Sequence, residues 1–346
     1  MNKILVIGLN WIGDVVMSFP ALMSLQKVDV LTRPHLTPLY SLCPAVNNVF
    51  QIDWGNFRNI KLSEIRKIQK HNYSNILIFP SSFRAAILAF LIGRKNRTGF
   101  SGELRNILLT HAIDKPADFR KMHESELYKS LAHSVISQED KFLQSAEPSV
   151  IKHAKTLSVS SDTQLPKHLE NVQKEYIVIA PGAAFGAAKR WAPAKFAELA
   201  LNLYKATGKQ IITTGSNAEK QITSEVLSEI RKEYPGETSA CIDLGGKTSL
   251  PELINLLLNA SLLICNDSGT MHLGAVTGIP MVVAVGSTDM IRTGPLSENA
   301  IIVQGDSCSP PCRKKVCQRG DSHCMNSISA DAMFKASQEA LTYGKC

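Results

Sequence analysis

The sequence predicts an α/β protein built from two doubly wound, Rossmann-like domains that face each other across a cleft. Two series of short β-branched runs alternate with amphipathic stretches, and a polar, weakly patterned stretch near 158–173 separates the series. A chain of 346 residues also exceeds what one ordinary core holds. We therefore expect a first domain over 1–165, a second domain over 172–328, and a terminal segment over 329–346.

The first series begins at the N-terminus with the strand ILVIG at 4–8, which leads through the turn GLNWIGD into a helix. Buried parallel strands are also predicted at VDVLT (28–32) and NILIFP (75–80). Ligands of such sheets bind beyond the carboxyl ends of the strands. Asp14 lies just past the first strand end. This acid either stabilises the start of the helix, by capping it or through the helix dipole, or takes part in the chemistry of the site.

The second series contains six runs at the spacing of strand–helix units. The predicted strands are YIVIAPG (176–182), QIITTG (210–215), CIDLGG (241–246), LLICND (262–267), MVVAVG (281–286) and AIIVQG (300–305). A last helix is expected at DAMFKASQEALTYG, residues 331–344. The linker near 158–172 is where we expect any hinge between the domains.

One strand end of the second series, CNDSGTMHLG, predicts a site for an anion. Asp267, Ser268, Gly269 and Thr270 are expected at a helix N-terminus, with His272 in the first turn. Ser and Asp are common there as simple caps, and a histidine is common there as a packing residue. Small side chains that leave backbone N–H groups accessible favour binding of a diphosphate.

The sequence argues against several classes of protein. The spacing of Gly8 and Gly13 is not the GxGxxG dinucleotide fingerprint, and GxxxxGK[ST] is missing from the sequence. The longest fully apolar run, AAILAFLIG at 85–93, is much shorter than the roughly 20 residues of a membrane span. The N-terminus begins directly with a strand pattern rather than a signal peptide, so we expect a cytoplasmic protein without an integral membrane segment.

The net charge of +8 favours a partner rich in phosphate. Nucleic acid, an anionic membrane surface and a phosphorylated ligand all satisfy this condition. Aromatic residues make up only 6% of the chain, and no basic patch contains interleaved aromatics, which argues against nucleic acid. A local basic cluster lies at IGRKNRTGF (92–100), with Arg84 before it and Arg105 after it. For each member, a solvated surface position is the alternative to a ligand contact.

The eight cysteines include a cluster near the C-terminus. Cys308, Cys312, Cys317 and Cys324 fall in CSPPCRKKVCQRGDSHC. Clustering in a cytoplasmic protein favours metal ligands or reduced thiols over disulfides. The spacing is not that of paired CxxC motifs. Reduced cysteines without a ligand are favoured, and a structural zinc or iron–sulfur site is the alternative.

Four segments, in chain order, resemble glycosyltransferase family 9, the ADP-heptose:lipopolysaccharide heptosyltransferases, and most of all their heptosyltransferase II branch. The segments are GLNWIGDVVMSFPAL at the start, PGAAFGAAKRWAPAKFAELA (181–200), NDSGTMHLGAVTGIP (266–280) and GSTDMIRTGPL (286–296). The similarity runs over nearly the whole chain, and it includes 79–100 and HESELYKSL at 123–131.

The resemblance implies a GT-B fold in which the first domain binds the acceptor and the second binds the nucleotide sugar. It also implies that the terminal helix crosses back to the first domain. Members of this family invert the configuration at the sugar carbon, so a base must take the proton of the acceptor hydroxyl. Asp14 matches the family position proposed as that base. The alternative is an ordinary acid in the first turn of a helix.

The resemblance also assigns donor contacts. Lys189 matches a basic position that compensates the charge of the leaving diphosphate, and Arg190 is next to it. Asp267 is expected either to lie near the donor heptose or to order the loop that binds the diphosphate. Glu219 follows another strand end, where the family tends to have an acid near the donor, and pairing on a helix surface is the alternative.

The implied acceptor is a lipid-borne, phosphate-rich inner core, heptosyl-Kdo₂-lipid A. Gly13, Arg84 and Arg97 are the candidate acceptor contacts. The basic stretch 84–105 would also attach the protein peripherally to the inner membrane, at its cytoplasmic face. Nucleic acid is not an expected partner.

The implied reaction transfers L-glycero-D-manno-heptose from ADP-heptose. The sequence lacks an Asp-x-Asp triplet. With Lys189 and a helix N-terminus available, no cofactor or catalytic metal is required. Two alternatives stay open: a transferase of the same fold that uses a UDP or GDP sugar, and a non-catalytic protein that binds nucleotide sugars.

Overall fold

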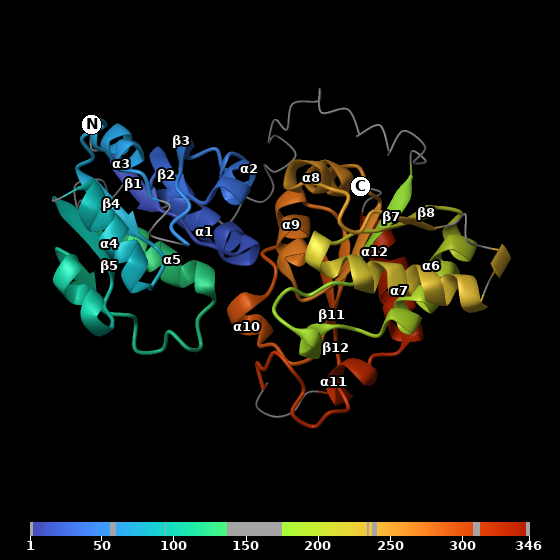
Figure 1. The fold of residues 1–346 in the computed structure, drawn as a ribbon. Coiled ribbons are helices and arrows are strands. Elements are labelled where there is room, and N and C mark those ends of the chain that lie inside the picture. The colour runs from blue at the N-terminus through green and yellow to red at the C-terminus, as the bar shows by residue number, and fades with distance from the viewer. Residues whose placement is uncertain are drawn as a thin grey trace. The chain divides into compact units, whose positions relative to one another are not determined.

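The computed structural model describes residues 3–55, 60–93, 95–136, 175–233, 235–236, 241–306 and 312–343. It divides into two compact α/β units, 1–157 and 158–346 (Figure 1). The predicted linker at 158–172 lies outside the described residues. The two units are therefore considered one at a time.

The first unit contains a six-stranded parallel sheet in the order β3-β2-β1-β4-β5-β6. Its strands are β1 (Ile4–Ile7), β2 (Val28–Thr32), β3 (Val46–Gln51), β4 (Asn75–Ile78), β5 (Asn96–Phe100) and β6 (His111–Ile113). Its α-helices are α1 (Ile12–Ser24), α2 (Thr37–Tyr40), α3 (Leu62–Gln69), α4 (Phe83–Ile92) and α5 (Glu124–His133), and its short 3₁₀ helices include η1 (Pro34–Leu36) and η3 (Glu103–Leu108).

The second unit repeats this plan with the order β12-β11-β10-β7-β8-β9. Its strands are β7 (Tyr176–Ala180), β8 (Gln210–Thr213), β9 (Cys241–Asp243), β10 (Leu262–Asn266), β11 (Met281–Val285) and β12 (Ala300–Gln304). Its helices are η7 (Ala187–Lys189), α6 (Pro193–Thr207), η8 (Asn217–Glu219), α7 (Lys220–Glu233), α8 (Leu250–Leu258), α9 (Gly269–Thr277), α10 (Met290–Thr293), α11 (His323–Asn326) and α12 (Ala330–Tyr343).

When the strands of each unit are numbered along the chain, both sheets have the order 3-2-1-4-5-6, which is that of a doubly wound Rossmann sheet. The predicted fold class is confirmed, and all nine predicted strands are present, β2 with the predicted bounds and the others with slightly shorter ones. The strand order reverses between β1 and β4 in the first sheet and between β7 and β10 in the second. Ligands of such sheets bind at these reversal points, beyond the carboxyl ends of the strands.

Three strands of the first sheet, β3, β5 and β6, were not predicted. β3 reads VNNVFQ, whose two asparagines disfavour a strand by local propensity. Both asparagines donate hydrogen bonds to Asp29 Oδ1 on the neighbouring strand, at 3.1 Å from Asn47 and 2.9 Å from Asn48. β5 reads NRTGF and lies inside the basic cluster that the sequence suggested as a surface. Both segments are strands because they pair with neighbouring strands of the sheet.

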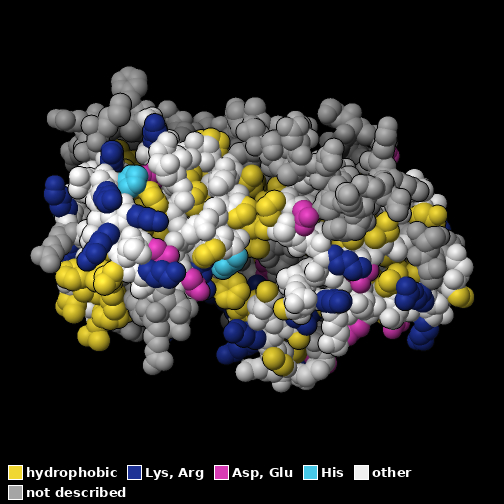
Figure 2. Space-filling model, turned by 45° about the horizontal axis from the view of Figure 1, so that its top comes forward, with side chains coloured by type: hydrophobic (Ala, Val, Ile, Leu, Met, Phe, Trp, Pro, Cys, Tyr) yellow, Lys and Arg dark blue, Asp and Glu magenta, His cyan; other side chains and the backbone are white. Residues whose placement is uncertain are grey.

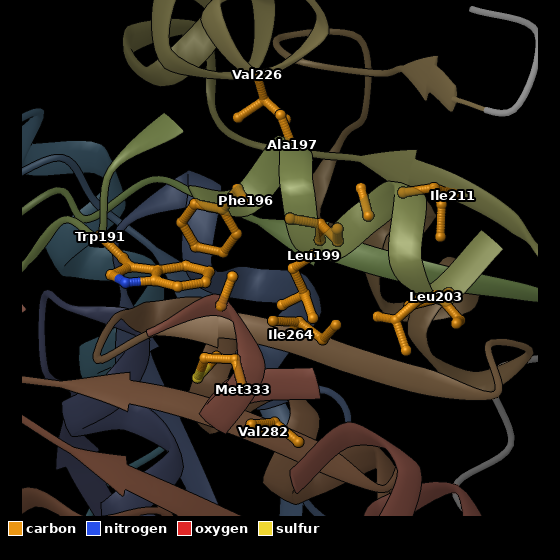
Figure 3. Packing of buried hydrophobic residues seen from close by; sticks show 14 of the residues in the cluster. Trp191, Phe196, Ala197, Leu199, Leu203, Ile211, Val226, Ile264, Val282 and Met333 are labelled. Atoms are coloured by element: carbon orange, nitrogen blue, oxygen red, sulfur yellow. The ribbon is translucent and has the colours of Figure 1, made fainter. Parts of the chain in front are cut away.

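The core of the second unit surrounds Trp191 and Phe196, whose rings meet edge-on with centroids 4.8 Å apart (Figure 3). Trp191 is fully buried, and its Nε1 donates to the carbonyl of Ile328 at 3.0 Å. Met333 of α12 joins the same cluster. The apolar face of α12 thus packs on the second unit, against α6 and strands β10 to β12. Its predicted crossing to the first unit stays a prediction.

No helix among the described residues has the length and apolar character that a membrane span requires.

Candidate active site

A pocket of about 260 Å³ lies in the first unit, at the point where the strand order reverses between β1 and β4. Segments that follow these two strands form part of its wall, and α5 closes another side. The lining residues are Leu9, Asn10, Trp11, Asp14, Phe79, Pro80, Ser81, Ser82, Phe100, Lys115, Glu124, Leu127 and Tyr128. The pocket therefore occupies the place where the fold predicts a ligand.

Asp14 lies in the first turn of α1 and lines this pocket. Its carboxyl group is half-buried. Burial is the main cause that raises its pKa to about 6, because the charged form loses hydration, and the nearby charge of Glu124 adds to the shift. A carboxylate with a pKa near 6 is a good general base around neutral pH. The structure therefore brings the predicted base to a pocket and gives it a suitable pKa.

Glu124 is a further candidate site residue, which the sequence did not point to. It begins α5, which packs closely against α1, and it lines the pocket with Asp14. The only sequence signal was the HESE stretch at a helix start, where acids are common in any case. Its effect on Asp14 depends on the packing of two helices that are more than one hundred residues apart in the chain.

Arg105 lies beneath the pocket wall and is 2% exposed. Its Nη1 donates to the carbonyl of Pro80 at 2.8 Å. Its Nε and Nη2 have no hydrogen-bond partner among the described residues. Burial lowers the pKa of this guanidinium. A buried arginine without an acidic partner is costly, and an anionic ligand would offset that cost.

The three predicted acceptor contacts fall outside the residues that line the pocket. Gly13 precedes Asp14 in α1. Arg84 is exposed at the start of α4, and its Nη1 donates to the carbonyl of Gly55 at 2.9 Å. Arg97 is 7% exposed, and its guanidinium donates to three backbone carbonyls, so it is engaged in the fold.

The second unit has a matching site where the strand order reverses between β7 and β10. Lys189, in η7 after β7, makes an ion pair with Asp267 after β10, with 2.6 Å between Nζ and Oδ2. Beneath this pair, the fully buried Asn266 receives a hydrogen bond from the N–H of Trp191 at 3.0 Å and donates to the carbonyl of Pro181 at 2.8 Å. Asn266 thus joins the two strand ends, a role that the sequence reading missed.

Ser268 is the N-cap residue of α9, and Gly269 and Thr270 form its first turn. This confirms the predicted helix N-terminus. The hydroxyl oxygen Ser268 Oγ is buried and without a partner among the described residues, and so are Ser287 Oγ and Thr288 Oγ1, which follow the neighbouring strand β11. Unsatisfied hydroxyls beside free N–H groups are suited to hydrogen bonding with phosphate oxygens.

The remaining predicted donor contacts have mixed surroundings. Arg190 donates weakly from Nη2 to the carbonyl of Ala183 at 3.4 Å, and its buried Nε has no partner within the described part of the chain. Glu219 accepts hydrogen bonds from the N–H and the hydroxyl of Ser216, at 2.9 and 2.7 Å, and so caps the start of η8, which precedes α7. Its carboxylate also lies against Gly182 at the end of β7. His272 is 4% exposed within α9.

The segment 312–316 packs directly on the loop that carries Lys189. The N–H of Ala188 donates to the carbonyl of Lys315 at 3.0 Å, and Gly186 lies so close to the Lys315 backbone that a Cβ would clash. The Nζ atoms of Lys189 and Lys315 lie 4.8 and 5.9 Å from the centre of the Phe185 ring. The contact with the segment 312–316 thus holds the loop of Lys189, which we call the lysine loop, in place.

Three cysteines of the predicted cluster are described, and Cys308 lies outside the described residues. Cys312 is exposed, while Cys317 and Cys324 are half-buried, and all three are free of disulfides. Among the described residues, no group of three or more His, Cys, Asp or Glu side chains is arranged to hold a metal ion. A structural metal site at this cluster stays a prediction.

The first Rossmann unit thus has a pocket with a carboxylate, and the second has a helix N-terminus with a lysine beside it. The family model described as glycosyltransferase family 9 (heptosyltransferase) matches residues 62–323. The chain belongs to glycosyltransferase family 9. This glycosyltransferase is an enzyme of the GT-B fold, as its solved structural neighbours are.

Named relatives agree with this family. The glycosyltransferase is 30% identical to lipopolysaccharide heptosyltransferase 2 of Salmonella typhimurium, over 87% of this chain and 88% of that protein. It is 28% identical to lipooligosaccharide heptosyltransferase 2 of Haemophilus influenzae over the same shares. The solved structure of E. coli ADP-heptose LPS heptosyltransferase II matches with a TM-score of 0.76 and 26% identity, over 99% of this chain and 100% of that one.

Proposed function

We propose that this glycosyltransferase transfers a heptose from ADP-heptose to a hydroxyl of the lipopolysaccharide inner core, heptosyl-Kdo₂-lipid A, with inversion at the sugar carbon. The observation that carries the proposal is the half-buried carboxyl of Asp14, with a pKa near 6, in a pocket of a family 9 enzyme. The names of the relatives support heptose as the sugar and lipopolysaccharide or lipooligosaccharide as the acceptor. The proposed location is the cytoplasmic face of the inner membrane.

In the proposed reaction, Asp14 accepts the proton of the acceptor hydroxyl. The hydroxyl oxygen forms a bond to the anomeric carbon of the heptose, while the bond from that carbon to the diphosphate oxygen breaks. ADP leaves with the electron pair of the broken bond, from the opposite face of the sugar. A base that is ionised above pH 6 and neutral below it performs this transfer efficiently near neutral pH.

The leaving ADP gains negative charge as the bond breaks. The proposed compensation comes from Lys189 and from the N–H groups at the start of α9, with Arg190 beside them. Lys189 is already held by Asp267, so the ammonium is positioned before the donor arrives. This set of groups suffices for a diphosphate without a divalent ion. We therefore propose that the reaction requires no metal.

Arg105 supplies the proposed recognition of the acceptor. Its Nε and Nη2, which have no hydrogen-bond partner among the described residues, lie behind Pro80 of the pocket wall, so Arg105 reaches an acceptor only if this wall moves. An inner-core acceptor carries carboxylate or phosphate groups, which accept such hydrogen bonds in a planar, paired geometry. Lys115, another lining residue, adds positive charge at the same pocket.

The decisive experiment is a transfer assay with heptosyl-Kdo₂-lipid A and ADP-heptose, in the presence of a chelator, with UDP and GDP sugars as alternative donors. We expect turnover with ADP-heptose alone, survival of turnover in the chelator, and loss of turnover in Asp14→Asn. Transfer from a UDP or GDP sugar would overturn the donor assignment. Binding of ADP-heptose without any transfer would favour a binding protein instead.

A further inference from the structure

One face of η3 exposes two large apolar side chains. Leu104 is 74% exposed and Ile107 is 78% exposed. A 3₁₀ helix has three residues per turn, so residues three apart lie on the same side. Leu104 and Ile107 therefore project together from the first unit. Exposure of two such side chains on one turn is unusual for a surface that faces only water.

The end of α4 extends this apolar surface. α4 packs against η3, and its residues Phe90 and Leu91 are each 42% exposed. We call Leu104, Ile107, Phe90 and Leu91 the apolar patch. Figure 2 shows hydrophobic side chains gathered at the left end of the view, on the first unit, with Lys and Arg side chains beside them.

Arg97 makes the base of this patch rigid. Its Nε donates to the carbonyl of Leu108 at the end of η3, and its Nη1 donates to the carbonyls of Gly93 and Lys95 after α4. Its guanidinium also lies 5.2 Å from the centre of the Phe90 ring. The two helices that carry the patch are thus joined by one buried cation, which explains why Arg97 is not free for an acceptor.

The surroundings of the patch are strongly basic. The segments 60–71 and 83–110, which include α3, α4 and η3, contain nine Lys or Arg residues and two Glu residues, and six of the basic side chains are exposed among the described residues. α3 is fixed beside the patch, because Gln69 Nε2 donates to the carbonyl of Leu91 at 2.9 Å. Lys67, Lys70 and Lys95 are exposed in these segments. An apolar centre with a basic rim complements the surface of an anionic bilayer.

We infer that the apolar patch inserts into the interface of an anionic lipid bilayer, while the exposed basic residues around it contact its headgroups. These are Lys61, Arg66, Lys67, Lys70, Arg84 and Lys95. η3 connects this surface to the acceptor pocket, since its Arg105 bonds to Pro80 of the pocket wall. A lipid-linked acceptor could therefore enter the pocket while its lipid stays in the bilayer. Only this last step rests on the proposed function, and the insertion does not.

The test measures binding of the full-length protein to vesicles of phosphatidylethanolamine with 30% phosphatidylglycerol, and to neutral phosphatidylcholine vesicles, by flotation without substrates. We expect binding to the anionic vesicles that weakens with salt. The double variant Leu104→Ser, Ile107→Ser should lose at least about tenfold in partitioning. The matched control Ile291→Ser, Val316→Ser, with residues 72% and 68% exposed in the second unit, should bind like the wild type.

A second readout locates the inserted residue. In Ile107→Trp, the added tryptophan should shift its emission to the blue on the anionic vesicles and be quenched by brominated lipid acyl chains. In Ile291→Trp it should do neither. Equal binding by the Leu104→Ser, Ile107→Ser variant and the wild type would overturn the inference. So would a wild-type protein that ignores vesicles and forms a dimer, which the double substitution abolishes.

The activity assay separates this inference from the proposed function. The double variant should transfer heptose to a delipidated, water-soluble core oligosaccharide as the wild type does, and should lose transfer to acceptor in vesicles. If the wild type transfers no heptose but still binds vesicles through the patch, the proposed function fails and the membrane surface stands.

Discussion

Lys189 Nζ and Asp267 Oδ2 lie 2.6 Å apart and link the ends of β7 and β10. Both side chains are largely buried, 16% and 7% exposed, so neither charge is well solvated without the other. The pair places an ammonium at the start of α9, where the leaving diphosphate is proposed to lie. The aspartate thus orients the cation that is proposed to compensate the charge of the leaving ADP.

Lys189→Gln should lower kcat by roughly 10²–10³-fold, because the developing charge on ADP loses its ammonium partner. The Asp267→Asn variant should lose less, and the double variant should lose no more than Lys189→Gln, since the two residues act as one unit. Steady-state kinetics with ADP-heptose measure this cycle. Lys314→Gln, at an exposed lysine next to Lys315, is the matched control. Strictly additive losses would contradict the coupling.

Asp14→Asn should reduce turnover by roughly 10²–10⁴-fold, which is the usual contribution of a general base. The fold should not suffer. The pKa of Asp14 is raised by folding from 3.8 to about 6, so its neutral form stabilises the protein below pH 4 and that stability is lost as the pH rises through 6.

At pH 8 the ionised Asp14 therefore costs up to about 3 kcal/mol, which an asparagine avoids. Thermal unfolding should show Asp14→Asn more stable than wild type at pH 8 and equal to it at pH 4. An inactive variant that is also less stable at pH 8 would show that the acid serves the fold instead.

Glu124→Gln should move the acidic limb of the kcat/KM profile to lower pH. The charge of Glu124 raises the pKa of Asp14, and removal of that charge lets the base ionise more easily. Burial is the larger cause, so the shift should be smaller than about one pH unit. The pH dependence of transfer between pH 5 and 8 measures it. Glu126→Gln, on the exposed side of α5, should leave the profile unchanged.

Gly186→Ala should raise KM for ADP-heptose about tenfold or more, because a Cβ would push Lys315 away from the loop of Lys189. Isothermal titration with ADP measures the loss of binding directly. Gly236→Ala is the control, since nothing lies within 4 Å of its added Cβ. An unchanged affinity for ADP would show that the 312–316 segment does not hold the donor loop.

Much of the organisation was predictable because it is local. Alternation of β-branched strands with amphipathic helices is visible in neighbouring residues, and it predicted nine strands in two sheets. The rule that ligands bind beyond strand ends then led to Asp14 and to the residues after β10, and both lie where the strand order reverses.

Other features arise only when distant segments meet. β3 and β5 have polar sequences, and pairing with their neighbours makes them strands. The pKa of Asp14 depends on Glu124 from another helix, and the lysine loop depends on Lys315 from a segment more than one hundred residues away. Arg97 and Arg105 lie close together in the basic cluster, yet packing engages the guanidinium of Arg97 in the fold and leaves Nε and Nη2 of Arg105 without a partner among the described residues. Charge and type are properties of a residue, whereas desolvation and hydrogen-bond partners are properties of its surroundings, and only tertiary packing supplies those.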